Sequence, residues 1–187
     1  MAPGENWYPT DNPDAIALSH TQWWYWASQL TATRIKEGSG LPQQIDARFY
    51  IVALHQLRSS ASTLAMPLLD APNRKILGIA IGDFERQCSD LTLARDIIMH
   101  FDDYTAGTGN KQLKRQKTDP TLTPAVLSLQ FATGIGYYPT EGQVCVGHIS
   151  FDLDSAQQAA ARLFDVLVVT LKTYRPHPAG SEESDHD

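Results

Sequence analysis

The sequence predicts a mainly α fold, a bundle of four to five helices with a β-hairpin inserted before the C-terminal helix. Apolar residues recur at steps of three and four over most of the chain, which is the spacing of one helix face. Within residues 125–151, two stretches instead alternate β-branched and apolar residues as strands do. The 187 residues, 42% hydrophobic and 19% charged, suit one globular domain with a full core.

Four predicted helices precede the hairpin. They cover residues 13–37, 43–65, 74–87 and 90–106. The first has Pro13 at its first helical position, and the fourth has Ser89 as its N-cap and the sequence GTG at its end. Asp154 is expected to cap a last helix over residues 155–174, in which alanine and leucine recur on one face.

The hairpin is predicted from two short alternating segments. Its strands are residues 125–132 and 143–151, with a turn rich in glycine between them, and His148 faces outward from the second strand. No linker composition divides the chain, so we expect a single helical-bundle domain over residues 1–175. Residues 176–187 are small, polar and acidic, and are predicted to be a disordered tail.

Charge and cysteine content narrow the functional class. A formal net charge of −6 argues against a protein whose whole surface binds nucleic acid, although a local basic patch is compatible with it. Cys88 and Cys145 form neither a disulfide framework nor a CxxC metal motif, which favours a cytoplasmic location. Residues 1–15 do not resemble a secretory signal. No stretch is apolar enough over its length to span a bilayer, so we expect no membrane association.

Residues 92–104 carry the most distinctive polar pattern. Arg95 and His100 stand five positions apart in a mostly apolar segment, and Asp96 follows the arginine. A guanidinium binds phosphate through two parallel hydrogen bonds, and an imidazole moves a proton near neutral pH. Together they could hold a phosphodiester and protonate a leaving 5′-oxygen or orient a 2′-hydroxyl. These two side chains are sufficient for RNA cleavage without a metal.

This stretch resembles the HEPN family, all-helical ribonucleases of toxin–antitoxin and antiphage systems. The family motif is an arginine, a polar residue, and a histidine after four to six intervening positions, and Arg95, Asp96 and His100 match it with four. The resemblance implies ribonuclease activity without a cofactor, a homodimer that joins two motifs in one cleft, and an antitoxin or regulatory partner. In one toxin subgroup a tyrosine lies two residues after the histidine, where this chain has Asp102, with Tyr104 two residues further on.

A second pair, Arg48 and His55, fits the same motif with six intervening residues. A step of seven places them on one helix face, whereas a step of five rotates by about 140°. Because Phe49 follows Arg48 where the family has a polar residue, Arg95 and His100 are preferred, although both helices could present polar groups to one cleft. The plainer alternative is that Arg95 pairs with a nearby aspartate and His100 is half-buried and hydrogen-bonded.

Four basic residues that follow this motif are candidates for binding RNA. They are Lys111, Lys114, Arg115 and Lys117, in a segment predicted as a loop. In an acidic chain this is the one concentration of positive charge, and a phosphodiester approaching His100 would need such a patch. The alternative is a solvated loop that binds nothing.

Two further patterns provide alternative functions. His20, His55 and His100 lie on three predicted helices and could bind zinc or nickel, but no Glu-x-x-His or His-x-x-x-His pair accompanies them, and we assign no metal site. The tryptophan-rich residues 21–27 are expected to form core or a dimer seam rather than a platform for stacking bases. The second class of function is therefore a non-catalytic helical module that dimerises or binds a partner.

Overall fold

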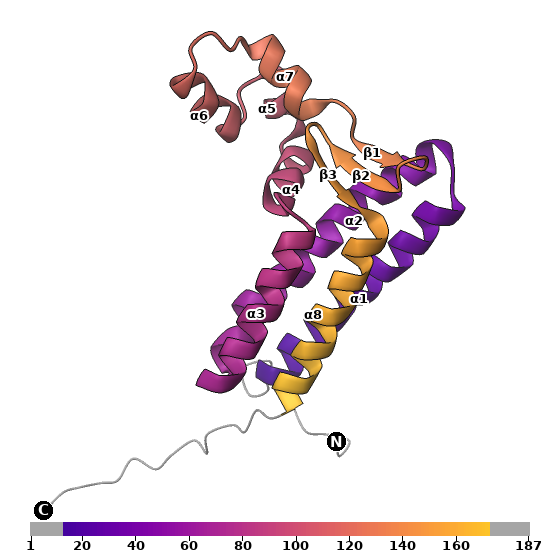
Figure 1. Cartoon of the computed structure of the whole chain (residues 1–187), viewed down its shortest axis with the longest axis vertical. Helices are drawn as coiled ribbons and strands as arrows, with labels where there is room; N and C mark the ends of the chain where they lie inside the picture. Colours follow the sequence, from indigo (N-terminus) through magenta and orange to yellow (C-terminus); the bar gives the residue numbers. More distant parts are fainter. Residues whose placement is uncertain (1–12, 173–187) are drawn as a thin grey trace, which may run out of the picture.

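Four long helices form the body of the protein. The computed structural model describes residues 13–172, and it confirms the predicted mainly α fold. The long helices are α1 (Pro13–Glu37), α2 (Gly40–Ser60), α3 (Ala71–Gln87) and α8 (Leu153–Lys172). α1 packs against α2 and α8, and α3 packs against α8. The shorter helices α4 to α7 and a small sheet lie at one end of this bundle (Figure 1).

The bundle core consists of apolar side chains at helical spacing. Ile51, Leu54 and Leu57 of α2 are fully buried, and so are Leu163 and Leu167 of α8. Steps of three and four place each set on one face of its helix. Burial of each of these side chains contributes roughly 1.5–3 kcal/mol, so α2 is held firmly against the rest of the bundle.

The connection between α2 and α3 departs from regular helix. Residues Ala61–Ala65 form a π-helical turn, η2, and Met66–Leu68 form a 3-10 turn, η3. The carboxylate of Asp70 then caps α3, because it accepts a hydrogen bond from the Asn73 backbone N–H at 2.9 Å. The second and third predicted helices are confirmed, each with an earlier start than the sequence indicated.

The predicted fourth helix is in fact two helices, α4 (Leu91–Met99) and α5 (Phe101–Ala106). They are separated at His100, whose backbone φ of −123° and ψ of 44° lie outside the helical region. α4 packs against α2 whereas α5 packs against α7, and the break allows one segment to reach both. Ser89 is not the N-cap: Asp90, with a left-handed φ of 57°, precedes the first helical residue.

The basic segment is a helix, α6 (Asn110–Thr118), and the predicted loop is wrong. Its start is fixed by the buried Gln112 side chain, which accepts a hydrogen bond from the Gly109 N–H and donates one to the Tyr104 carbonyl, both at 2.8 Å. Gln112 is the one buried residue of α6. The segment therefore lacks the apolar period from which a helix is predicted.

The segment predicted as the first strand of the hairpin is also a helix, α7 (Pro124–Ala132). The Thr123 hydroxyl accepts a hydrogen bond from the Val126 N–H at 3.3 Å, and Pro124 occupies the first turn. Leu127 and Phe131, four residues apart, form its buried face. These capping signals outweigh the alternation of apolar residues that suggested a strand.

A three-stranded antiparallel sheet precedes α8. In spatial order its strands are β1 (Gly136–Tyr138), β2 (Gln143–Val146) and β3 (Ile149–Asp152). The β2–β3 hairpin turns at Gly147 and His148, so His148 lies in a turn and not on a strand as predicted. Gly147 has φ 59°, and a Cβ there would lie 2.4 Å from the Gln130 carbonyl oxygen. Gln44 of α2 bonds both backbone groups of Tyr137 and so ties β1 to the bundle.

Asp152, and not Asp154 as predicted, caps α8. Its carboxylate accepts a hydrogen bond from the Ser155 N–H at 2.7 Å, and bonding to Ser155 lowers the pKa of Asp152. Asp154 lies in the first turn and pairs with Lys36 of α1. The predicted tail, residues 176–187, lies outside the described residues. Among the described helices, none has the length and apolar character needed to cross a membrane.

Candidate functional site

The packing of α4 on α2 brings Arg95, Asp96 and His55 into one polar cluster. Arg95 and Asp96 are half-buried on α4, and Arg95 Nη1 donates a hydrogen bond to Asp96 Oδ1 at 2.9 Å. His55 is half-buried on α2, where the charges of Arg95, Asp96 and Arg58 act on its titration. The expectation that Arg95 pairs with a neighbouring aspartate is confirmed, with Asp96 as the partner.

The surroundings of His55 favour the neutral imidazole. Burial lowers the pKa of His55 below the usual histidine value, and the guanidiniums of Arg95 and Arg58 lower it further, while Asp96 opposes them. The Nδ1 atom of His55 is buried and has no hydrogen-bond partner among the described residues. A neutral imidazole with an unoccupied ring nitrogen is suited to accept a proton at neutral pH.

Arg95 carries a second unsatisfied atom in the same cluster. Its Nε is buried and has no hydrogen-bond partner in the described part of the chain, although Nη1 is paired with Asp96. A buried polar atom left without a partner costs about 1–3 kcal/mol, and such atoms are rare in native folds. Trp24 Nε1 and Gln29 Nε2 also lack partners in the described chain, but His55 and Arg95 are ionisable residues on two packed helices, and this makes their contact a candidate site.

His100 does not join this cluster through any hydrogen bond. It lies at the break between α4 and α5, and its side chain is exposed and forms no hydrogen bond or ion pair within residues 13–172. The alternative that His100 is half-buried and hydrogen-bonded is therefore wrong. An exposed imidazole five residues after Arg95 is accessible to a ligand from solvent.

The fold gives the two residues of the second motif, Arg48 and His55, different surroundings. Arg48 is exposed on α2 whereas His55 is half-buried, and within the described residues no hydrogen bond or ion pair joins them. Arg58 of α2 and Asp96 of α4 line the same cavity, which confirms that both helices present polar groups to one cleft. The cross-helix association of His55 with Arg95 follows from the packing of α2 on α4, and neither linear motif identifies it.

A groove runs along α4 from this cluster towards α6. Its inner part is a cavity of about 260 Å³, lined by Arg58, Asp96 and Lys111 among other residues. Its outer part is a cavity of about 480 Å³ on the α6 side. Asp90, Leu93 and Lys111 line both cavities, so the two parts are neighbours along α4. We call the whole feature the α4 groove.

Basic side chains of α6 line the outer part of the α4 groove. Those that line it are Lys111, Lys114 and Arg115, whereas Lys117 does not. The Arg115 guanidinium lies 5.1 Å from the centre of the Phe131 ring, a cation–π contact. His148 packs edge-on against the same ring at 4.7 Å between centroids and also lines the groove. The hairpin turn thus adds a residue that sequence reasoning placed elsewhere.

Two other groups of the inner part are chemically inert. The Cys88 thiol lines the cavity, but burial raises its pKa to about 12, so it is protonated and is not a nucleophile at neutral pH. Arg58 pairs with Glu85, whose carboxylate compensates the guanidinium charge at this rim. Of the cluster, Asp96 lines the inner part, and it is bonded to Arg95 behind it.

The three histidines considered as metal ligands are held in different surroundings. His20 Nδ1 lies 2.9 Å from Ser60 Oγ, within hydrogen-bond distance, while His55 belongs to the α2–α4 cluster and His100 is exposed. Over residues 13–172, no group of three or more His, Cys, Asp or Glu side chains is placed to hold a metal ion. The described chain therefore offers no ligand set for the metal-binding alternative.

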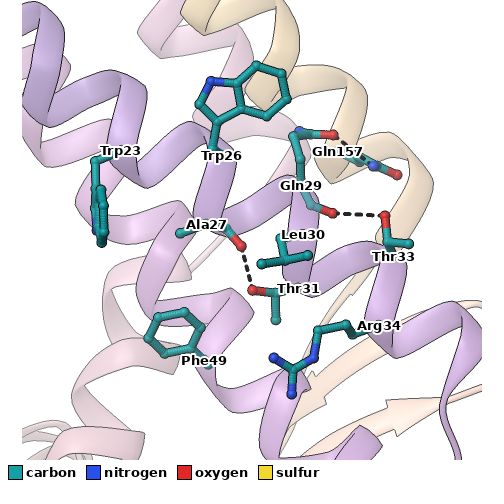
Figure 2. Close-up of a pocket in the computed structure, with 10 residues that line it drawn as sticks. All are labelled: Trp23, Trp26, Ala27, Gln29, Leu30, Thr31, Thr33, Arg34, Phe49 and Gln157. Carbon is teal, nitrogen blue, oxygen red and sulfur yellow. Dashed lines mark hydrogen bonds between the residues drawn. The ribbon is translucent and has the colours of Figure 1, made fainter.

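A second groove lies on the outer face of α1 and is apolar. It has a volume of about 690 Å³ and is lined by Trp23, Trp26 and Leu30 of α1 and by Phe49 of α2. Figure 2 shows the rings of Trp23, Trp26 and Phe49 arranged around Leu30. Trp24, in contrast, is partly buried against the core. We call this feature the α1 groove.

Comparison with known proteins returned no relative: no family model, no curated protein and no solved structure matches the chain. Function is therefore inferred from the geometry of the two grooves, together with the HEPN-like spacing of Arg95, Asp96 and His100.

Proposed function

We propose that the protein is a HEPN-like, metal-independent endoribonuclease whose reaction takes place beside His55, Arg95 and Asp96. The observation that carries the proposal is the pair of buried nitrogens without partners in the described chain, His55 Nδ1 and Arg95 Nε, in a cluster whose third member, Asp96, lines a cavity together with Lys111. An arginine that can hold a phosphodiester and a neutral histidine that can accept a proton are the minimum equipment for this reaction. The motif spacing of Arg95, Asp96 and His100 supports the same class of activity.

Each side chain has a separate role in the proposed reaction. The Arg95 guanidinium binds the scissile phosphate, and Asp96 fixes its orientation through Nη1. His55 accepts the proton of the ribose 2′-hydroxyl, whose oxygen attacks phosphorus, and the exposed His100 donates a proton to the 5′-oxygen as its bond to phosphorus breaks. The products are a 2′,3′-cyclic phosphate and a 5′-hydroxyl end, and the reaction uses no cofactor.

The α4 groove provides the path for the RNA. Lys111, Lys114 and Arg115 line its outer part and would contact the phosphates that flank the scissile one, with Lys117 further along α6. No described ion pair occupies the two lysines within the groove. Their charges are therefore available to a polyanion even though the chain as a whole is acidic.

The family resemblance extends the proposal to partners and setting. It implies a homodimer, a toxin–antitoxin or antiphage defence role, and an antitoxin or regulatory protein that restrains the ribonuclease. A cytoplasmic location suits an RNA substrate and accords with the two free cysteines of the described chain.

The proposal is tested by incubating single-stranded RNA with the purified full chain in the presence of EDTA. We expect cleavage that EDTA does not inhibit and fragments with 5′-hydroxyl ends. Arg95→Ala and His100→Ala should each lower the rate by about 100- to 10,000-fold, the usual contribution of a positioned acid or base. An inactive wild-type chain, or variants as active as the wild type, would refute the proposal.

A second candidate function is a non-catalytic module that binds another protein, and the apolar α1 groove favours it. It differs from the first in requiring no chemistry at His55 or Arg95. Absence of RNA cleavage by the wild-type chain, combined with stable association through α1, would select this function.

A further inference from the structure

The Asp90 carboxylate is the one acidic group lining the α4 groove that has no partner within residues 13–172. Its side chain makes no capping hydrogen bond to α4 and belongs to no ion pair of the described chain. The other carboxylates that line the groove, those of Glu85, Asp96 and Asp119, are bonded to neighbouring groups of the protein. Asp90 is therefore available to a ligand.

The backbone holds Asp90 at the boundary between the two parts of the groove. Asp90 lines both the inner and the outer cavity. Its φ of 57° is left-handed, a conformation that aspartate and asparagine adopt more readily than most residues with a side chain. Its carbonyl accepts a hydrogen bond from the Ala94 N–H at 2.9 Å, which ties it to the first turn of α4. The exposed carboxylate thus has a fixed place in the groove.

A carboxylate at this point is unfavourable for a phosphate but suits a base. Like charges repel, so a phosphate of the RNA would not lie against Asp90. Lys111 lines the same two cavities and can bind that phosphate instead. The N–H groups of a nucleobase, in contrast, are donors that a free carboxylate accepts. An RNA chain that follows α4 would therefore pass Asp90 with a base.

Guanine is the base whose edge best matches a carboxylate. Its N1–H and its 2-amino group are adjacent donors, and the two carboxylate oxygens can accept one hydrogen bond from each. Adenine and cytosine have one amino group beside a ring nitrogen that accepts, and uracil has one N–H between two carbonyl oxygens. Each of these three bases would bring an acceptor against the Asp90 carboxylate, which guanine does not.

The outer cavity also offers surfaces for the faces of such a base. Its volume of about 480 Å³ lies within the range of ligand sites, about 300–1,000 Å³. The apolar side chains of Leu93 and Leu122 line it and are half-buried. Arg115, which lies over the Phe131 ring, adds a guanidinium plane on which a base can stack while its N–H groups contact a phosphate.

From the free carboxylate, its fixed position and the cavity beside it, we propose that Asp90 selects guanosine in the RNA, at a nucleotide that flanks the scissile phosphate. The carboxylate accepts hydrogen bonds from N1–H and the 2-amino group, and Lys111 binds the adjoining phosphate. This inference rests on the proposed ribonuclease function for its choice of RNA as the ligand. Recognition of guanine itself requires no cleavage, so it can be measured separately.

The first test is the binding of mononucleotides to the full chain, measured by isothermal titration calorimetry. We expect guanosine 5′-monophosphate to bind at least ~10-fold more tightly than the adenosine, cytidine and uridine monophosphates. Inosine 5′-monophosphate lacks the 2-amino group and should lie between them. Asp90→Asn should lower the affinity for the guanosine nucleotide by about 10-fold and leave that for the adenosine nucleotide unchanged.

The variant is chosen to keep the fold, because asparagine adopts the left-handed conformation as aspartate does. The matched control is Asp102→Asn, which removes an exposed carboxylate of α5 that lines neither cavity, and it should leave all affinities unchanged. Equal affinity for the four nucleotides, no binding of any of them, or a guanosine preference that persists in Asp90→Asn would overturn the inference.

A second test separates this inference from the ribonuclease proposal. A pool of random RNA is incubated with the wild type in EDTA, and the fragments with 5′-hydroxyl ends are sequenced. Guanosine enriched at one position beside the cut, and no longer enriched with Asp90→Asn, would support both proposals. Cleavage without a guanosine preference would overturn the selection by Asp90 alone. Guanosine-selective binding without cleavage would refute the ribonuclease and support the recognition of guanine.

Discussion

The α4 groove and the α1 groove belong to the same helical bundle but are built from opposite kinds of side chain. The α4 groove contains arginines, lysines, aspartates and a cysteine, and its Asp96 is bonded to Arg95, whose buried Nε lacks a hydrogen-bond partner among the described residues. The α1 groove contains tryptophan, leucine and phenylalanine beside uncharged polar residues, among them Gln29, whose Nε2 is buried without a partner in the described chain. Its one charged lining residue in the described chain pairs with Asp46.

The difference indicates what each surface is suited to bind. Behind the α4 groove, the unfavourable feature is the ionisable pair His55 and Arg95, whose buried nitrogens lack partners in the described chain and would be satisfied by a polar ligand. In the α1 groove the unfavourable feature is apolar area held in water, which only another apolar surface would relieve. We therefore assign chemistry to the first groove and association to the second.

The largest expected effect comes from substituting Arg95, which should remove activity without lowering stability. Arg95→Met removes the phosphate-binding fork, so we expect RNA cleavage to fall by about 100-fold or more. The same change removes a buried, unpartnered donor and breaks the part-exposed ion pair with Asp96, which is worth about 0–1 kcal/mol, so the free energy of unfolding should change by about 1 kcal/mol or less. Cleavage assays and urea denaturation of the same preparation test both parts. A destabilisation of several kcal/mol would assign Arg95 a structural role instead.

The next effect concerns the opposite face of the same helix. Ile97 is fully buried on α4, two residues from Arg95, and Ile97→Ala should lower the free energy of unfolding by about 2–5 kcal/mol. Urea denaturation measures this loss. If Ile97→Ala and Arg95→Met cost the same stability, the division of α4 into a packing face and a functional face would be wrong.

A smaller effect is expected from the lysines of α6. Lys111→Ala and Lys114→Ala should each weaken RNA binding and lower the slope of log affinity against log salt concentration by about one, because each removes one phosphate contact. Lys117→Ala is the matched control, since Lys117 lies on the same helix but does not line the groove. Fluorescence anisotropy of labelled RNA at several salt concentrations gives both quantities. An equal effect at all three positions would point to a diffuse charge effect.

The smallest effect is the contribution of His55 to stability against pH. Its pKa is lowered in the folded chain, so the unfolded chain binds the proton more readily, and folding is favoured when the group is neutral. Stability should therefore decrease as pH falls through the usual histidine range near 6.5. In His55→Gln this dependence should be weaker. Thermal unfolding of both chains between pH 5 and 8, in matched buffers, measures the difference. Identical pH dependence would show that the burial of His55 is unimportant.

Much of the fold could be predicted from apolar spacing, and the departures have physical causes. The long helices α2, α3 and α8 each bury a regular apolar face, which is the signal that sequence reasoning detects best. α1 instead buries small and polar residues such as Thr21, Ser28 and Ala32 and leaves large apolar side chains exposed. α6 was missed because its stability comes from one buried glutamine, Gln112, and not from an apolar stripe. α7 was missed because its apolar residues alternate, while Thr123 and Pro124 determine that it begins as a helix.

The candidate site was predictable only in part. Arg95 and Asp96 were identified by the spacing of a linear motif, and the lysines of α6 by their charge. The association of His55 with Arg95 could not be read from spacing, because it arises between two helices about forty residues apart in sequence, where α4 packs on α2. The break at His100 was equally hidden, because it follows from α5 packing against α7.

The most direct test of the central claim compares two residues of α2 that the second motif links and the fold separates. RNA cleavage in EDTA is measured for the wild type, His55→Ala and Arg48→Ala under single-turnover conditions. The account predicts that His55→Ala loses at least ~100-fold in rate, while Arg48→Ala, exposed on α2, stays close to the wild type. Equal rates for His55→Ala and the wild type would contradict the assignment of chemistry to the α4 groove.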